Sequence, residues 1–580
     1  MFTKLLVANR GEIAVRVIRA CRDLDITSVA IYSDLDSEAV HVRLADEAYN
    51  VGPGPAAESY LKIPAIIDVA RRSGAEAVHP GYGFLAENGG FARAVVDAGL
   101  VWVGPPADVI DAMGDKTAAR RAASDAGVPV VPGTPDPVTS ADAVTAFATE
   151  HGFPIAIKAS AGGGGKGFRV VATADDIEDA LAGAAREAKA YFSSSDVYLE
   201  RYLERPRHVE VQVLGDSSGA VLSFPERDCS LQRRHQKLVE ESPSPALEPA
   251  VREAIMEAAA KVSKQVGYRN AGTCEFLLDA DQKTFYFLEM NTRLQVEHPV
   301  TELATGVDLV VAQLKVASGE PLDFSQDDID LHGHAVECRI NAENPAKNFL
   351  PAPGTISDYR EPSGPGVRVD SGVAAGSVVP QAYDPLIAKL VTYGSSRDEA
   401  RRRMLRALRE YDIGGIRTTI PFHLLMLADP RFVAGDYHTG TVEKETDLSV
   451  LKEAPAVKPK PGEAEIAERD LQVEVNNKRF AVRVREHLNT TVRPRKPAPP
   501  KKASAVSGGV SEVVSAPMQG TIVKVLVRAG QAVKAGDTVC VLEAMKMENS
   551  ILAHVDGKVE ELSVEAGQSV EMGTTIAVIR

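Results

Sequence analysis

The sequence is poor in cysteine, with five cysteines among 580 residues, and no two of them have the Cys-x-x-Cys spacing of a redox or zinc motif. An odd number of scattered cysteines excludes a disulfide-based scaffold and indicates reduced thiols. They are Cys21, Cys229, Cys274, Cys338 and Cys540.

Long apolar runs are also missing. No stretch approaches the roughly 20 apolar residues that a membrane helix needs. The first 20 residues are interrupted by Lys4, Arg10, Arg16 and Arg19, which excludes the apolar core of a signal peptide. We therefore expect a cytoplasmic protein with no membrane segment.

An excess of positive charge is absent as well. Lys and Arg number 65 against 80 Asp and Glu, a formal net charge of -15, so nothing in the overall charge favours nucleic acid or an anionic membrane as a partner. The remaining composition, 44% hydrophobic and 25% charged, is typical of globular proteins. At this length about four domains are expected, with proteins and small molecules as partners.

The N-terminal part alternates apolar strand patterns with amphipathic helix patterns. Residues 4–8 and 28–32 are predicted strands, and residues 12–24 are a predicted helix between them. This alternation predicts α/β layering up to about residue 114. A second α/β unit follows, and a third unit contains a basic helix predicted at residues 397–409.

The C-terminal part differs from the rest of the chain in composition and in its sequence patterns. Two alternating runs in residues 471–484, around Asn476-Asn477, predict a β-hairpin. Residues 493–509 contain mostly Pro, Lys, Ala, Ser and Gly and predict a linker. The pattern of residues 527–539 recurs at 564–576, which predicts a small pseudo-symmetric β-sandwich.

Lys546 lies between the two repeats, in the sequence Glu-Ala-Met-Lys-Met. A lysine exposed at a hairpin turn beside two methionines is well placed for a ligase to acylate its amine. The alternative is an ordinary hairpin lysine. Residues 513–580 resemble the biotin carboxyl carrier domain, whose motif is matched without a gap, so the resemblance implies biotin on Lys546.

A glycine-rich stretch occupies residues 162–167 and follows an apolar run. Consecutive glycines let backbone N–H groups close over phosphates. The stretch is not a Walker A loop, because Lys166 is followed by glycine where Ser or Thr is required. A hairpin that merely connects strands is an equally good interpretation of this stretch alone.

A row of polar residues follows the apolar sequence Phe-Tyr-Phe-Leu of a strand predicted at residues 284–290. In an extended chain one face would be entirely polar, which is costly unless those side chains hold ligands. The row comprises Glu289, Asn291, Arg293, Gln295 and Glu297. Oxygen donors from Glu275, Glu289 and Asn291 suit Mg²⁺ (or Mn²⁺) bound with nucleotide phosphates. The alternatives are a solvated edge strand and, for Arg293 and Glu297, a mutual ion pair.

The order of these motifs over about residues 1–440 resembles biotin carboxylase, an ATP-grasp enzyme. The motifs lie at residues 79–88, 116, 158, 162–167, 207–212, 227–237, 289–297 and 334–343. With the carrier domain, the chain resembles the α-subunit of acyl-CoA carboxylases. The expected fold is a multidomain α/β and α+β protein ending in a β-sandwich.

The resemblance implies six segments. They are an N-terminal α/β domain (1–114), an ATP-grasp domain (115–327), a biotin carboxylase C-terminal domain (328–440), a connecting segment with the hairpin (441–492), a flexible linker (493–512) and the biotin carrier domain (513–580).

The resemblance also implies residue roles. ATP would be bound by Lys116, Lys158, Gly163, Gly164, Gly165, Glu200, Leu203, His208, Gln232 and His235, with Lys237 near the transferred group. Bicarbonate would be bound by Arg293, Gln295 and Val296, with Glu297 as its general base. Arg339 would stabilise the enolate form of biotin, and carboxyphosphate would form from ATP and bicarbonate.

No segment beyond residue 440 is long enough for a carboxyltransferase. We therefore expect a separate carboxyltransferase β-subunit, a biotin protein ligase that modifies Lys546, and homo-oligomers within a larger α/β complex. The competing hypotheses are another ATP-grasp carboxylate–amine ligase with a lipoyl-type carrier, and a scaffold without activity. The acceptor acyl-CoA is not encoded in this chain.

Overall fold

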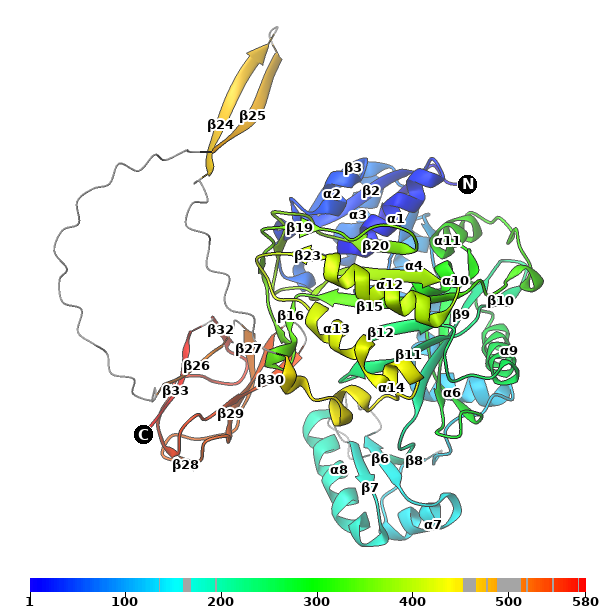
Figure 1. Cartoon of the computed structure of the whole chain (residues 1–580), viewed down its shortest axis with the longest axis vertical. Coiled ribbons are helices and arrows are strands. Elements are labelled where there is room, and N and C mark those ends of the chain that lie inside the picture. Colours follow the sequence, from blue (N-terminus) through cyan, green and yellow to red (C-terminus); the bar gives the residue numbers. More distant parts are fainter. Residues whose placement is uncertain are drawn as a thin grey trace, which may run out of the picture. The chain divides into compact units, whose positions relative to one another are not determined.

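The computed structural model describes residues 1–134, 136–159, 168–192, 196–451, 466–475, 478–487, 513–517, 520–544, 547–571 and 573–580. Contacts divide the chain into two units, Met1–Leu451 and Lys452–Arg580 (Figure 1).

The first unit begins with a five-stranded parallel sheet in the order β3-β2-β1-β4-β5. Leu5, Leu6 and Val7 of β1 are fully buried, as expected for a parallel strand covered on both faces. The predicted strand–helix–strand start is confirmed to within a residue or two. The elements are β1 (Lys4–Val7), α1 (Gly11–Asp23), β2 (Thr27–Ser33), α2 (Val40–Leu44), β3 (Glu47–Gly52), α3 (Ile63–Ser73), β4 (Ala77–His79), α4 (Gly89–Asp97), β5 (Val101–Trp102) and α5 (Ala107–Gly114).

A small lobe follows, with its own antiparallel sheet in the order β7-β6-β8 (Figure 1). Ile155, Ile157 and Leu199 of this sheet pack with Val144 of α7 in a separate hydrophobic cluster. The elements of the lobe are α7 (Ala141–His151), β6 (Ile155–Ala159), β7 (Phe168–Val171), α8 (Ile177–Phe192) and β8 (Val197–Arg201). The preceding helix α6 (Lys116–Asp125) packs instead against residues of the large sheet.

The centre of the first unit is a nine-stranded antiparallel sheet in the order β14-β13-β9-β11-β12-β15-β22-β20, with β10 beside β9. Its strands are β9 (Arg207–Gly215), β10 (Val221–Ser223), β11 (Arg227–Arg233), β12 (Gln236–Ser242), β13 (Asn270–Leu278), β14 (Phe285–Asn291), β15 (His334–Asn341), β20 (Val367–Ser371) and β22 (Leu386–Gly394). Its helices are α9 (Pro249–Gln265), α10 (His298–Thr305), α11 (Leu309–Ala317), α12 (Arg397–Glu410), α13 (Ile420–Ala428) and α14 (Pro430–Ala434). Short strand pairs complete it: β16 (Glu343–Asn344) with β17 (Leu350–Pro351), β18 (Gly354–Thr355) with β21 (Val378–Val379), and β19 (Tyr359–Arg360) with β23 (Asp412–Ile413).

This sheet continues across the predicted boundary between the ATP-grasp and C-terminal domains. Strand β12 pairs with β15, where Val239 lies opposite Cys338 and Glu240 opposite Glu337. Residues from the two predicted domains therefore hold fixed positions relative to one another. The division at residue 327 stays a prediction.

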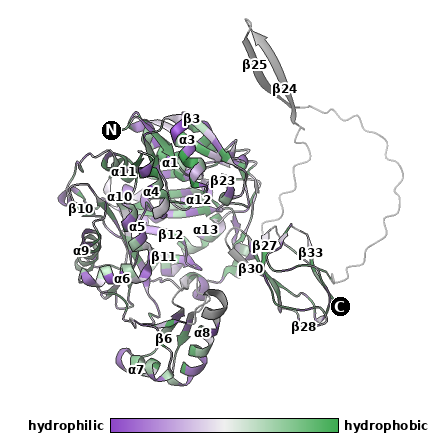
Figure 2. Cartoon of the chain, turned by 180° about the vertical axis from the view of Figure 1, so that it is seen from behind, coloured by the Kyte–Doolittle hydropathy of each residue, from purple (hydrophilic) through white to green (hydrophobic). Residues whose placement is uncertain are grey.

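Helix α12 confirms the basic helix predicted at residues 397–409. It buries Ala400, Met404, Ala407 and Leu408 and turns its charged residues outward. Figure 2 accordingly shows hydrophilic and hydrophobic residues mixed along this helix. Among the described helices of the whole chain, none combines the length and apolar composition that crossing a bilayer requires.

The second unit contains the predicted hairpin. Strands β24 (Ile466–Val475) and β25 (Lys478–His487) are antiparallel, and Val475 pairs with Lys478. The predicted hairpin is therefore confirmed, while Asn476, Asn477 and the predicted linker lie outside the described residues.

The C-terminal residues form two four-stranded sheets, in the orders β26-β33-β31-β28 and β30-β29-β27-β32, which confirms the predicted β-sandwich. Gly530 and Gly567 occupy equivalent places in the two repeats and have φ of 88° and 89°, a conformation that favours glycine. The strands are β26 (Val513–Ser515), β27 (Gly520–Val525), β28 (Ala532–Val533), β29 (Thr538–Ala544), β30 (Met547–Leu552), β31 (Gly557–Leu562), β32 (Ser569–Val570) and β33 (Thr575–Ile579).

Candidate active site

The candidate metal ligands lie on β14, at the edge of the large sheet, and on its neighbour β13. Glu275 and Glu289 are directly opposite one another in the antiparallel register. The Asn291 Nδ2 donates a hydrogen bond to Glu275 Oε1 over 2.8 Å, and Lys116 Nζ lies 3.6 Å from Glu289 Oε2. Two carboxylates and an amide oxygen on paired strands are hard donors that fit Mg²⁺.

The metal-ligating atoms that lie close enough together to share an ion come from a different set of residues. Among the described residues they are His208 with Glu210 and Glu275, and Glu210 with Cys229 and Glu297. Of the three candidate ligands, only Glu275 belongs to either group. Burial alone would raise the pKa of Glu275, but Lys237 and His208 outweigh it and hold that pKa well below its ordinary value. Glu275 is therefore ionised, as a metal ligand must be.

The expectation of one extended polar strand face was wrong beyond Asn291. Strand β14 ends at Asn291, and the chain then turns into α10, whose first residues are His298 and Pro299. A proline fits the first turn of a helix, so Pro299 suits the start of α10, and the residues between Asn291 and His298 are neither strand nor helix. Arg293, Gln295 and Glu297 lie in the connecting loop.

The loop nevertheless brings the predicted polar residues together. Arg293 donates to Gln295 Oε1 over 2.9 Å and to Asn291 Oδ1 over 3.3 Å, and Gln295 Nε2 donates to Glu275 Oε1 over 3.2 Å. Arg293 Nε also lies 3.1 Å from Glu87 Oε2 of the N-terminal part. The predicted bicarbonate-binding side chains thus adjoin the candidate metal ligands.

Glu297 is completely buried between two cations. Its Oε1 accepts a hydrogen bond from Lys237 Nζ over 2.6 Å, and its Oε2 accepts one from Arg339 over 2.8 Å. Burial alone would raise the pKa of Glu297, but Lys237 and Arg339 lower it well below its ordinary value. The alternative of a mutual Arg293–Glu297 ion pair is not what the structure shows, because each residue has other partners.

Lys237 joins three carboxylates at the centre of the site. Its ammonium group bonds Glu210, Glu275 at 2.9 Å and Glu297 at 2.6 Å. Burial would lower the pKa of Lys237, yet these carboxylates raise it well above its ordinary value. A permanently charged ammonium here can hold anionic groups in place.

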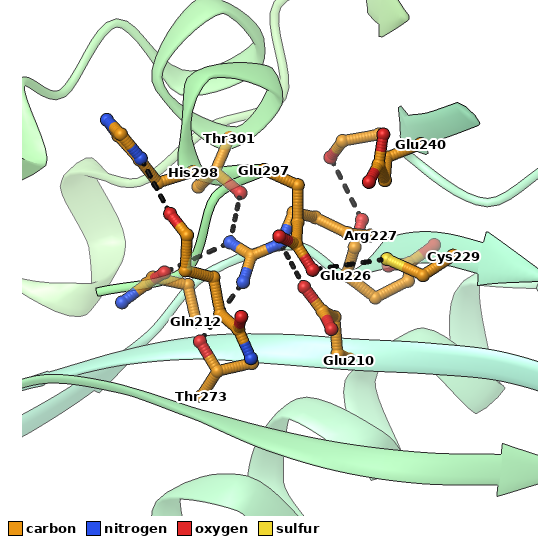
Figure 3. A network of polar contacts seen from close by, with 12 residues as sticks. Glu210, Gln212, Glu226, Arg227, Cys229, Glu240, Thr273, Glu297, His298 and Thr301 are labelled. Atoms are coloured by element: carbon orange, nitrogen blue, oxygen red, sulfur yellow. Dashed lines mark hydrogen bonds and ion pairs between the residues drawn. The ribbon is translucent and has the colours of Figure 1, made fainter. Parts of the chain in front are cut away.

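A fully buried arginine, Arg227, bonds one carboxylate of this cluster, Glu210 (Figure 3). The Arg227 guanidinium donates to Glu210 over 2.6 Å, to Gln212 and Thr301 over 3.0 Å each, and to Thr273 over 3.1 Å. Neither Arg227 nor Glu210 was predicted as a site residue. The available signal was the presence of several charged residues in β9 and β11, two strands that are buried along their whole length.

The predicted ATP-binding residues surround a second cluster on the small lobe. Lys158 of β6 bonds the carboxylate of Glu200 on β8, and Arg120 donates to the same carboxylate over 2.6 Å. Leu203 is buried beside Val131 and Tyr286. An apolar wall beside a charged cluster suits an adenine ring and the phosphates that follow it.

The other predicted ATP-binding residues lie near Lys237. His208 Nε2 is 2.8 Å from Glu275 Oε2. Burial would lower the pKa of His208, but Glu275 raises it above the ordinary value. Gln232 lies opposite Lys237 in the β11–β12 pair, and His235 occupies the turn with φ of 63°. Gly163, Gly164, Gly165 and Lys546 lie outside the described residues, although the strands on either side of Lys546 pair Ala544 with Met547.

Family models match four segments of the chain. They are the biotin carboxylase N-terminal domain over residues 1–110, the ATP-binding domain of the carbamoyl-phosphate synthase L chain over 115–325, the biotin carboxylase C-terminal domain over 337–444, and the model of biotin-requiring enzymes over 512–579.

One curated relative matches nearly the whole chain, and a second matches about three quarters of it. The biotin-dependent acyl-coenzyme A carboxylase alpha3 subunit of Mycobacterium leprae is 49% identical over 569 residues, which cover 95% of this chain and 94% of that protein. Biotin carboxylase 1 of Bacillus subtilis is 52% identical over 443 residues, covering 76% of this chain and 98% of that protein.

Solved structures agree. The biotin carboxylase domain of the 2-oxoglutarate carboxylase of Hydrogenobacter thermophilus, crystallised with MgADP, ADP and bicarbonate, is 46% identical with a TM-score of 0.72, covering 78% of this chain and 100% of that chain. Biotin carboxylase of Campylobacter jejuni is 44% identical with a TM-score of 0.72, covering 76% and 98%. The chain therefore belongs to the family of biotin carboxylases, ATP-dependent ligases, and it carries a biotin carrier domain in the same polypeptide.

Proposed function

We propose that this chain catalyses the ATP- and bicarbonate-dependent carboxylation of biotin attached to its own Lys546, as the first half-reaction of an acyl-CoA carboxylase. The observation that carries the proposal is the carboxylate of Glu297, held between Lys237 and Arg339 beside the Glu275–Asn291 cluster. The relative of similar length is named as an acyl-coenzyme A carboxylase subunit, which supports this class of acceptor.

ATP occupies the space between the small lobe and the large sheet in this proposal. Lys116 and Lys158 contact the phosphates, and Leu203 and Glu200 line the adenine pocket. Glu275, Glu289 and Asn291 hold Mg²⁺, which offsets negative charge on the phosphates. A structure of a 46% identical relative that contains MgADP supports this assignment.

Bicarbonate binds beside the metal ligands. The Arg293 guanidinium grips the anion with Gln295 and the backbone of Val296, and the ionised Glu297 accepts its proton, so that the oxygen can attack the terminal phosphorus of ATP. Because Lys237 and Arg339 keep Glu297 charged, the base is ready at neutral pH. The bicarbonate oxygen would bond the terminal phosphorus while the bond from that phosphorus to the bridging oxygen of ADP breaks, so that carboxyphosphate and ADP are formed.

Carboxyphosphate would release CO₂ and phosphate, the phosphate would take the proton of the ureido nitrogen of biotin, and that nitrogen would then bond the carbon of CO₂. Arg339 lies on β15 with its guanidinium on Glu297, so the same cation that orients the base can stabilise negative charge on the ureido oxygen. Two further proteins complete the proposal: a separate carboxyltransferase subunit and a biotin protein ligase that modifies Lys546. We propose homo-oligomers within that complex. The cytoplasmic location expected from composition stays a prediction.

The deciding experiment is intact-mass analysis with peptide mapping of the full chain produced together with a biotin ligase, beside the Lys546→Ala variant. A single biotinyl adduct at Lys546 that is lost in the variant supports the carrier role. A lipoyl adduct, or none, contradicts it and favours the other ATP-grasp ligases. Lys534, on the turn between β28 and β29, gives a matched control variant, Lys534→Ala, which should keep the adduct.

A further inference from the structure

Lys389 is a buried cation that the mechanism above does not use. It lies in the middle of β22, within the apolar sequence Leu-Ile-Ala-Lys-Leu-Val, and its side chain is 0% exposed. A lysine is almost never fully buried unless its ammonium group has partners. Its position therefore calls for an account of what the ammonium group holds.

The ammonium group bonds the bicarbonate loop directly. Lys389 Nζ donates a hydrogen bond to the backbone carbonyl of Val296 over 2.9 Å. That carbonyl belongs to the peptide bond between Val296 and Glu297, so its direction fixes the peptide plane from which the Glu297 side chain starts. A hydrogen bond with a charged donor is among the stronger ones, and here water is excluded.

Strand register places Lys389 and Arg339 side by side. Arg339 of β15 lies directly opposite Lys389 of β22, so both side chains leave the same face of the sheet. Arg339 holds the carboxylate of Glu297, and Lys389 holds the carbonyl that precedes the same residue. The two ends of Glu297 are thus fixed by one rigid pair of strands.

The remaining neighbours of the ammonium group come from other parts of the fold. Glu12 Oε1 of α1 lies 3.2 Å away, Asp370 Oδ2 of β20 lies 3.8 Å away, and the Tyr82 ring centroid lies 5.9 Å away. Glu12 and Tyr82 belong to the N-terminal part, whose motif at residues 79–88 adjoins the site. The single nitrogen Nζ of Lys389 therefore contacts residues of the N-terminal part, of the loop and of the sheet.

We propose that Lys389 is a positioning residue for bicarbonate activation: it holds the Val296 carbonyl so that Glu297 and the Val296 backbone face the anion together. The inference rests on the proposed function. It does not make Lys389 a catalytic residue, because the ammonium group touches neither substrate nor reacting atoms. A misplacement of about 1 Å in such a loop costs on the order of 10²-fold in rate.

The test uses the full biotinylated chain and the double variant Glu12→Gln/Lys389→Met. Removing both charges avoids leaving Glu12 buried without its cation. We expect kcat/KM for bicarbonate to fall by on the order of 10²-fold, mainly through KM for bicarbonate, while KM for ATP stays within about twofold. Hydrogen exchange should accelerate in the peptide that covers residues 291–298.

The matched control is Arg368→Met. Arg368 is another cation of the same sheet, and its guanidinium bonds Asp370 over 2.7 Å and Glu302 over 2.7 Å, neither of which belongs to the loop. Its loss should leave KM for bicarbonate and exchange at residues 291–297 unchanged, since its partners are Asp370 of β20 and Glu302 of α10. Lys389→Arg keeps a cation for Glu12 and is the second variant if the double variant fails to fold; its larger planar head should displace the carbonyl and raise KM for bicarbonate.

The two proposals fail in different ways. Unchanged KM for bicarbonate and unchanged exchange at 291–298 in a folded Lys389 variant would overturn the positioning role. A wild-type chain that cleaves no ATP in response to bicarbonate would refute the proposed function instead. In that case the exchange measurement, which does not depend on catalysis, still decides whether Lys389 holds the loop.

Discussion

Replacing Glu297 with glutamine tests the central chemical claim. The variant keeps the shape of the side chain but cannot accept a proton from bicarbonate. General base catalysis contributes about 10²–10⁴-fold, or roughly 3–5 kcal/mol, so we expect bicarbonate-dependent ATP cleavage to fall by that factor. Nucleotide binding should persist, because the predicted ATP contacts lie elsewhere.

The effect on stability should be smaller than usual for a buried ion pair. Removing one partner of such a pair often costs about 3–5 kcal/mol, because the other charge is left uncompensated. Here Lys237 keeps Glu210 and Glu275, and Arg339 keeps Glu240 at 2.5 Å. The loss should therefore be nearer 2 kcal/mol, roughly that of hydrogen bonds to charged groups.

Glu240→Gln is the matched control. Glu240 is also fully buried and bonds the same arginine, Arg339, but the structure shows no contact between it and Lys237. If Glu297 is the base, Glu240→Gln keeps at least a tenth of wild-type activity in steady-state ATP cleavage. Equal losses in the two variants, or more than a tenth of wild-type activity in Glu297→Gln, would refute the assignment.

Three further predictions concern pH, metal and partner binding. Burial, opposed by a hydrogen bond from Asn341, raises the pKa of Glu343 from 4.5 to about 7. The charged form of Glu343 is thus disfavoured in the folded state, so the wild-type protein loses stability as the pH rises from about 5 through 7. Relative to wild type, Glu343→Gln should therefore gain up to about 3 kcal/mol in free energy of unfolding between about pH 5 and pH 8, measured by urea unfolding at these two pH values. A difference between the two proteins that does not change with pH would contradict this. Glu289→Gln should raise the Mg²⁺ concentration for half-maximal ATP cleavage about tenfold or more while Mg²⁺-independent nucleotide binding persists; an unchanged Mg²⁺ titration would remove Glu289 from the ligand set. Deleting residues 465–490, which contain the β24–β25 hairpin, should weaken association with the carboxyltransferase subunit in sedimentation experiments, and full association of the deletion variant would exclude a docking role.

Local sequence patterns predicted the strands well where apolar and polar residues, or turn glycines, recur at a regular spacing. The alternation around Asn476-Asn477 predicted β24 and β25, and the recurring glycines at 530 and 567 predicted the sandwich. In both cases the signal lies within a few residues, because turn chemistry and side-chain alternation are local properties.

The residues of the polar row were predicted to lie together, and the structure does bring them together, but not on one strand. The row is Glu289, Asn291, Arg293, Gln295 and Glu297, of which only the first two belong to β14, because the strand ends at Asn291 and a loop leads to α10. Their roles stay predictions. The partners of Glu297 come from β12 and β15, whose pairing is set by long-range contacts that no local pattern encodes. Lys237 and Arg339 were therefore assigned to the site by resemblance alone, and only the structure shows that they contact Glu297.

The same long-range pairing explains how the site keeps its charge state. Lys237 on β12 and Arg339 on β15 lie on adjacent strands whose register is fixed by the pairing of Val239 with Cys338. Their separation is a property of the sheet, so Glu297 meets both cations whenever its loop is in place. The loop itself does not belong to the sheet. The sheet holds it through Lys389, which bonds the backbone carbonyl of Val296, next to Glu297. In our proposal the cations of the sheet set the pKa of Glu297, and Lys389 sets the direction of its side chain. We therefore expect loss of Lys389 to change the affinity for bicarbonate more than the binding of ATP.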